Sequence, residues 1–156
     1  MTAAKKTNPG RGVRGRLPRR REIAVHVVLG ALWLSGAAWL VLRYFLRPAG
    51  DFGELPHPLE PWMLRLHGLA AFAALWLLGQ LWIVHIVPSW RSHRRNSGIL
   101  LSALMGVLLV TGWLLYYATG DRAREIASLV HWTLGLALVV PLLLHALRHR
   151  SRRWRD

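Results

Sequence analysis

Residues 66–90 read LHGLAAFAALWLLGQLWIVHIVPSW and contain no Asp, Glu, Lys or Arg. Three other stretches are equally free of charge, at residues 23–42, 96–120 and 126–147. The hydrocarbon core of a bilayer is about 30 Å thick, and about 20 helical residues are needed to cross it. Each stretch is long enough, and a chain in lipid must satisfy its backbone hydrogen bonds internally. The sequence therefore predicts an all-α integral membrane protein, built as a four-helix bundle.

Prolines refine the expected helices. Pro61 is suited to the first turn of the second helix, where its missing N–H costs nothing. Pro141 lies inside the fourth stretch and is expected to kink that helix. No internal sequence repeat is apparent.

The charge of the chain lies at its ends and joints. The 156 residues include 21 Lys and Arg against 7 Asp and Glu, a formal net charge of +14. A nucleic-acid-binding protein would spread basic residues over amphipathic elements, so no nucleic-acid partner is expected. With both termini on the cytoplasmic side, the basic residues lie mostly inside, which satisfies the positive-inside rule and predicts an N-in, C-in topology.

Three regions follow from this pattern. Residues 1–21 form a basic tail rich in Gly and Pro that is expected to be disordered. Residues 22–148 form the four-helix domain, whose first helix is interpreted as an uncleaved anchor because it is too long for the apolar part of a secretion signal. Residues 149–156 form a basic C-terminal tail. Attraction to anionic membrane lipid explains both tails.

Five of the eight histidines lie within the predicted spans. Ionisable residues inside membrane helices are rare and usually face the bundle interior, so each is a functional candidate. Their depths define two layers. The inner layer holds His26, His85 and His145, and the outer layer holds His67 and His131. For any one of them alone, a buried histidine bonded to a neighbour is the simpler interpretation.

The spacings indicate two stacked cofactor sites. His131 and His145 are 14 residues apart, and His67 and His85 are 18 apart, so each pair shares a face of a regular helix. No span contains an acid, and the chain has no Cys, so most metal sites and covalent c-type haem lack their usual ligands. Haem needs two axial imidazoles and an apolar pocket. Three glycines near these histidines could leave room for a flat ring: Gly30, Gly68 and Gly135.

Histidines on helices one and two, with a pair 14 residues apart on helix four, resemble the bacterial dihaem cytochrome b superfamily. It includes cytochrome b561, the cytochrome b subunit of membrane nickel–iron hydrogenases and the gamma subunit of formate dehydrogenase. The resemblance covers roughly residues 20 to 150. It implies two haem b groups as cofactors and a place in the bacterial cytoplasmic (inner) membrane.

The resemblance also implies a role for individual residues. It pairs His67 with His131 on the outer haem iron, and His26 with His145 on the inner one. Asn96 and Gly98 look like part of the quinone site of the formate dehydrogenase subunit, although Asn, Ser and Gly are also ordinary helix-capping residues. His85 is additional to the four-ligand pattern. It could replace His26, hydrogen-bond a quinone or relay protons.

The implied function is transmembrane electron transfer between a periplasmic donor and the membrane quinone pool. The chain would be either the membrane subunit of an oxidoreductase with a separate dehydrogenase chain, or a stand-alone cytochrome b561-like protein. A homodimer is compatible with both. Whether the chain is itself an enzyme stays open. The alternative is a haem-free four-helix membrane protein, either a small transporter or an assembly factor, although a transporter would be expected to carry an acid or a broken helix at mid-membrane.

Overall fold

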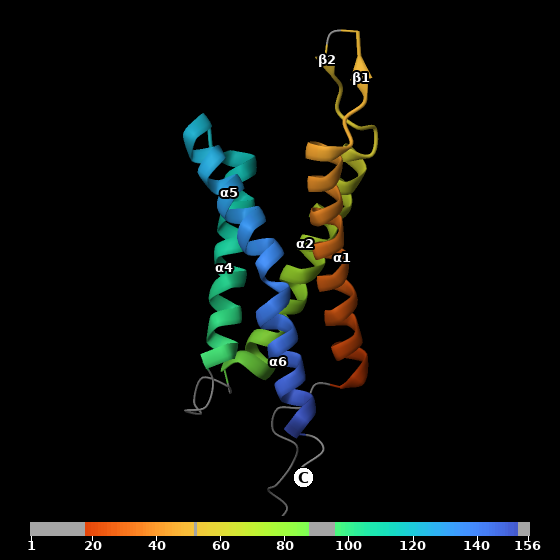
Figure 1. Cartoon of the computed structure of the whole chain (residues 1–156). Helices are drawn as coiled ribbons and strands as arrows, with labels where there is room; N and C mark the ends of the chain where they lie inside the picture. Colours follow the sequence, from red (N-terminus) through yellow and green to blue (C-terminus); the bar gives the residue numbers. More distant parts are fainter. Residues whose placement is uncertain (1–17, 52, 88–95, 153–156) are drawn as a thin grey trace, which may run out of the picture.

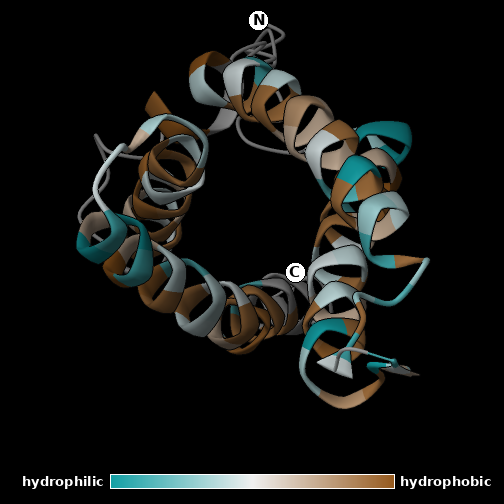
Figure 2. Cartoon of the chain, turned by 90° about the horizontal axis from the view of Figure 1, so that it is seen from above, coloured by the Kyte–Doolittle hydropathy of each residue, from teal (hydrophilic) through white to brown (hydrophobic). Residues whose placement is uncertain are grey.

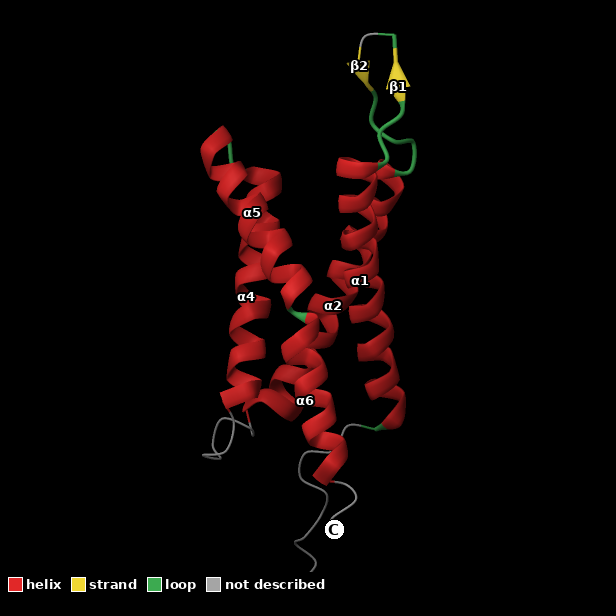
Figure 3. Ribbon diagram, in the orientation of Figure 1, coloured by secondary structure: helices red, strands yellow, loops and turns green. Residues whose placement is uncertain are grey.

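A computed structural model describes residues 18–51, 53–87 and 96–152 (Figures 1 and 3). The described chain is almost entirely helical. Its helices are α1 (Arg19–Phe45), α2 (Glu60–Leu81), the π-helix η1 (Trp82–Ile86), α4 (Asn96–Tyr117), α5 (Asp121–Ala137) and α6 (Val139–Arg152). A two-stranded antiparallel hairpin, β1 (Ala49–Gly50) and β2 (Gly53–Glu54), projects from the α1–α2 connection, with Ala49 opposite Glu54.

Within the described residues, four helical segments are long and apolar enough to cross a membrane. They are Arg19–Phe45, Glu60–Leu81, Gly98–Tyr117 and Asp121–His145, the last of which combines α5 with most of α6. The predicted helical fold, with four helices long and apolar enough to span a membrane, is thus confirmed. Large apolar side chains lie exposed along these segments, as in Phe72 (75% exposed) and Trp76 (66% exposed). An exterior of this kind suits lipid as the surrounding medium.

The helices form two pairs. α1 packs along α2, α4 packs along α5, and fewer contacts join one pair to the other. Viewed from above, the helices form a ring around a common axis (Figure 2). α1 begins and α6 ends at the same end of the bundle, opposite the β-hairpin (Figure 1). Two chain ends at one end of the bundle are what an even number of spans requires.

Two helix boundaries differ from the expected ones. α1 begins at Arg19, so residues 19–21 of the predicted basic tail are helical, and α6 extends into the C-terminal tail as far as Arg152. The expected disorder of residues 1–17 lies outside the described residues. Helix α1 can begin among these charges because the side chains of Arg19, Arg20 and Arg21 are exposed and reach solvent.

α2 begins six residues before the charge-free stretch, at Glu60. The Glu60 carboxylate accepts a hydrogen bond from the backbone N–H of His57 at 3.1 Å and lies 3.5 Å from the Arg43 guanidinium. Pro61 lies in the first turn, as predicted. A carboxylate in the first turn opposes the positive end of the helix dipole, and its hydrogen bond to His57 ties the preceding connection to the helix, which favours the early start. The Glu60 side chain is only 8% exposed, which its charge alone would not have predicted.

The fourth span is interrupted at Leu138, between α5 and α6. Pro141 has no N–H to donate to the carbonyl of Ala137, four residues earlier, and its ring crowds that carbonyl. The neighbouring bonds persist: Leu138 N–H donates to Leu134 at 2.9 Å, and Leu142 N–H donates to Leu138 at 3.2 Å. The predicted kink is therefore confirmed. The second helix also departs from regular geometry at its C-terminal end. There α2 is followed directly by the π-helix η1, which contains His85.

Candidate functional site

His67 of α2 and His131 of α5 come together in the half of the bundle nearer the β-hairpin. Their imidazole ring centroids are 6.1 Å apart, and the ring planes are inclined at 80°. The two residues are 64 positions apart in sequence and belong to different helix pairs. The outer layer of two histidines at matched depth, predicted from the sequence, is thus found as a spatial pair.

Helix α1 holds the imidazole of His67. Its Nδ1 is 2.9 Å from the backbone carbonyl oxygen of Leu32 and 3.2 Å from Oγ of Ser35. A carbonyl oxygen can only accept a hydrogen bond, so Nδ1 carries the proton. Neutral His67 therefore has its lone pair on Nε2, which is the atom able to coordinate a metal.

Helix α4 holds the imidazole of His131 in the same way. Oγ1 of Thr111 lies 3.0 Å from Nδ1 of His131. The hydroxyl hydrogen of Thr111 is directed to its own helix, with Oγ1 at 2.8 Å from the carbonyl of Val107. Oγ1 therefore accepts from Nδ1–H, and a backbone hydrogen bond from the ring to Leu108 supports the same arrangement. His131 thus also presents Nε2 as its coordinating atom.

Two glycines that were not among the predicted ones lie against the imidazole rings. A Cβ on Gly36 would lie 3.0 Å from Cε1 of His67, and one on Gly112 would lie 3.2 Å from Cε1 of His131. A Cβ on Gly30 or Gly68 would meet nothing within 4 Å, and one on Gly135 would only touch Leu108 at 3.8 Å. The room expected at these three was for the flat ring of a haem, and it stays a prediction. The close approach is across a helix pair.

Ser35 and Thr111 are unusual because they are buried in a bundle that buries little. Ser35 is 2% exposed and Thr111 is 7% exposed. In the apolar part of each span, by contrast, at most 11% of the residues are buried. Buried hydroxyl groups need hydrogen-bond partners, and here the partners are the imidazoles and the helix backbone. Neither Ser35 nor Thr111 could be connected with the histidines from the sequence. Their distance in sequence from the histidines left no local pattern to find.

The donor set of this pair fits a bis-histidine haem. A metal–imidazole bond of about 2 Å, with about 1.1 Å from the nitrogen to the ring centre, separates two axial ring centroids by about 6 Å. Two rings on opposite sides of one iron can adopt any angle between their planes. The protonated Nδ1 of each ring is bonded to a helix, which is the usual support for a metal-binding histidine. The residues present therefore suit this group.

The predicted inner ligands His26 and His145 lie on α1, which begins, and α6, which ends, at the end of the bundle opposite the β-hairpin. His26 is exposed, and its Nδ1 lies 2.7 Å from the carbonyl of Glu22 on its own helix. His145 is half-buried on α6. The pairing of His26 with His145 stays a prediction. The helical rotations expected from the sequence assumed regular helices, but the break at Leu138 lies between His131 and His145, and η1 contains His85.

The candidate quinone residues are placed only by their backbone. His85 lies in η1, at the end of the bundle where α4 begins with Asn96 and Gly98. A π-helical turn inserts an extra residue into a helix and occurs frequently at functional sites. The side chains of His85 and Asn96 are outside the described atoms, and a Cβ on Gly98 would meet nothing within 4 Å.

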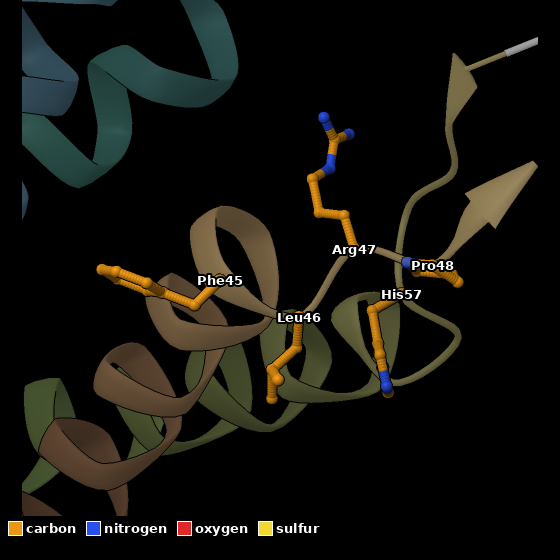
Figure 4. A pocket seen from close by; sticks show the side chains of 5 residues that line it. All are labelled: Phe45, Leu46, Arg47, Pro48 and His57. Atoms are coloured by element: carbon orange, nitrogen blue, oxygen red, sulfur yellow. The ribbon is translucent and has the colours of Figure 1, made fainter.

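A shallow depression of about 340 Å³ lies at the base of the β-hairpin, away from the histidine pair (Figure 4). Its side chains diverge: Arg47 and Phe45 project away from His57 and Leu46. Arg47 is 3.7 Å from Glu54 and Arg43 is 3.5 Å from Glu60, so both arginines have acidic partners. This depression lacks convergent polar groups and is a weaker candidate than the histidine pair.

No family model matches the chain, and no characterised protein or solved structure matches it either. Among the described residues, no group of three or more His, Asp or Glu is arranged to hold a metal ion. The two-histidine site, held by helices apolar enough to span a membrane, is therefore the feature of the chain that indicates a function.

Proposed function

We propose that the protein is a dihaem b-type cytochrome that transfers electrons across a membrane, between an outer-side donor and quinone near the inner side. The observation that carries this proposal is the 6.1 Å separation of the His67 and His131 rings. Both rings are anchored through Nδ1, so Nε2 of each remains available as a ligand, and the separation of the ring centroids suits two ligands that share one iron. The four apolar helices supply the membrane setting.

Haem iron would supply the one-electron redox change when bound. The residues of the chain would do the remaining work. His67 and His131 would hold the outer group, and His26 with His145, or with His85 in place of His26, would hold the inner one. An iron held by two histidines would have no free position for oxygen, which would favour electron transfer. Near the inner end, His85, Asn96 and Gly98 would bind quinone, and His85 could supply a proton to it.

The cytoplasmic location of both termini belongs to the same proposal. The positive-inside rule places the β-hairpin and the histidine pair on the periplasmic side of a bacterial inner membrane. There the donor would be a small molecule or a dehydrogenase chain.

The experiment is a reduced-minus-oxidised visible spectrum of the purified protein, together with a pyridine haemochrome count. We expect two b-type haems per chain. His67→Ala and His131→Ala should each reduce the count to one, since each removes an axial ligand of the same group. His57→Ala is the matched control, because His57 lies in the α1–α2 connection, and it should retain two.

Absence of haem from the purified wild-type chain, even after reconstitution with haem, would contradict the proposal. It would favour the haem-free membrane protein, in which His67 and His131 are packing residues that satisfy Ser35 and Thr111. A count of two in both His67→Ala and His131→Ala would show that the pair is not the outer site.

A further inference from the structure

Two five-residue segments on different helices hold the histidine pair. They are Leu32–Gly36, with the sequence LWLSG, on α1, and Leu108–Gly112, with the sequence LLVTG, on α4. In each, a leucine is followed three positions later by a hydroxyl residue and then by glycine. The match was not apparent as a sequence repeat, because it is short and lies among many similar apolar residues. We call the two segments the clamp segments.

The clamp segments make the same three contacts with their histidines. The leucine carbonyl, of Leu32 or Leu108, accepts a hydrogen bond from the ring. The hydroxyl oxygen of Ser35 or Thr111 lies 3.2 or 3.0 Å from Nδ1. Gly36 and Gly112 leave the room that each ring occupies. Each segment lies on the first helix of its pair, and each histidine lies on the second.

The hydroxyl hydrogen of each clamp segment is used within its own helix. Ser35 Oγ donates to the carbonyl of Leu32 at 3.0 Å, and Thr111 Oγ1 donates to Val107 at 2.8 Å. Each hydroxyl oxygen therefore faces its imidazole as an acceptor. The consequence is the same for both rings: Nδ1 keeps the proton, and Nε2 keeps the lone pair.

We propose that Ser35 and Thr111 are matched positioning residues, which act with the leucine carbonyls to hold His67 and His131 as Nδ1–H tautomers and which set their strength as ligands. The part of this inference that concerns haem rests on the proposed function. A ring whose N–H donates to an oxygen atom is a more basic ligand at its other nitrogen. A more basic axial ligand stabilises ferric over ferrous iron, so these hydroxyl groups lower the reduction potential of the outer haem.

The key variant is Thr111→Val, which keeps the shape of the side chain and removes its oxygen. Thr111→Ser restores a hydroxyl group and should restore the wild-type behaviour. Thr133→Val is the matched control, because the hydroxyl of Thr133 bonds only to its own helix, at 2.6 Å from the carbonyl of Leu129, among the described contacts. On α1, Ser35→Ala is compared with Ser102→Ala, whose hydroxyl bonds to Gly98 at 2.9 Å.

Three measurements are made on each full-length variant in detergent. A redox titration gives the midpoint potential of each haem, and haem titration gives the affinity. NMR of the histidine ring nitrogens in haem-free protein gives the tautomer of His67 and His131 and the rate at which each Nδ1–H exchanges with water. In Thr111→Val and Ser35→Ala, we expect a raised potential for one haem only and an affinity about ten- to a hundredfold lower. The Nδ1–H of the affected histidine should exchange faster, because only the leucine carbonyl still accepts its hydrogen bond, whereas Thr111→Ser, Thr133→Val and Ser102→Ala should match wild type.

The two proposals can fail separately. If wild type binds two haems but Thr111→Val and Ser35→Ala match their controls in potential, affinity and Nδ1–H exchange, the positioning role is wrong and the electron-transfer function stands. If wild type binds no haem but the NMR spectra show Nδ1–H tautomers in wild type and faster Nδ1–H exchange in the two variants, the clamp contacts stand, and the ligand-tuning role and the proposed function are both wrong.

Discussion

At the scale of single residues, the site depends on groups that do not themselves coordinate anything. His67 and His131 would hold the iron, but Ser35, Thr111 and two backbone carbonyls decide which ring nitrogen is available. Buried histidine in an apolar bundle has few partners, so each supporting contact has a large effect on the ring.

Gly36 and Gly112 set how closely each helix approaches its neighbour's imidazole. Gly112→Ala would place Cβ 3.2 Å from Cε1 of His131, so the ring must shift by a few tenths of an ångström. Alanine is favoured over glycine within a helix by about 1 kcal/mol, so the fold itself should not suffer. We expect Gly112→Ala to keep its helical content, measured by circular dichroism, and to lose affinity for one haem.

Gly106→Ala is the control for this variant, since it lies on the same helix and its Cβ would meet nothing within 4 Å. It should bind two haems like wild type. Equal haem affinity in Gly106→Ala and Gly112→Ala would show that the approach at Gly112 does not matter to the site.

At the scale of helices, irregularities separate the two halves of the bundle. The outer pair lies on regular stretches of α2 and α5, whereas the break at Leu138 precedes His145 and the π-helix η1 contains His85. A break or π-helical turn rotates the residues beyond it relative to a regular helix. The rotation of His145 and of residue 85 about their helices therefore could not be calculated from residue spacing.

Replacing Pro141 by Ala tests this role of the kink. The new N–H can donate to the carbonyl of Ala137, and a continuous helix would reorient His145 relative to His131. We expect Pro141→Ala to retain the outer haem and to change the potential or occupancy of the inner one, measured by redox titration and haemochrome count. Pro61→Ala, in the first turn of α2 where no helical bond is gained, should change neither. An unchanged inner haem in Pro141→Ala would show that the kink does not orient His145.

At the scale of the whole molecule, the bundle is two helix pairs with few contacts between them, and the histidine rings are one place where the pairs approach each other. Trp33 of α1 adds a link, with its indole N–H 3.3 Å from the carbonyl of Leu136 on α5. Among described residues, no large side chain is fully buried, so side-chain packing alone interlocks the pairs weakly. A group held between His67 and His131 would therefore join the two pairs.

The orientation in the membrane can be measured directly, because the chain has no cysteine. Asp51→Cys, in the β-hairpin connection, should react with a membrane-impermeant maleimide added to spheroplasts. Ser151→Cys, at the end of α6, should react only after the membrane is opened. The reverse pattern would contradict the N-in, C-in topology, and labelling of both from outside would contradict four spans.

The sequence alone was sufficient to predict four helices long enough to span a membrane, the break near Pro141 and the matched heights of His67 and His131 along the bundle. These depend on local quantities: the length of a charge-free stretch, the missing N–H of proline and the rise per residue of a helix. The tertiary structure alone decided that the two rings lie 6.1 Å apart, that Ser35 and Thr111 hold them, and that Gly36 and Gly112 make room. Those contacts depend on how one helix is rotated against another. Spans that are apolar on every side carry no periodic pattern to indicate that rotation, so it emerges only when the helices pack.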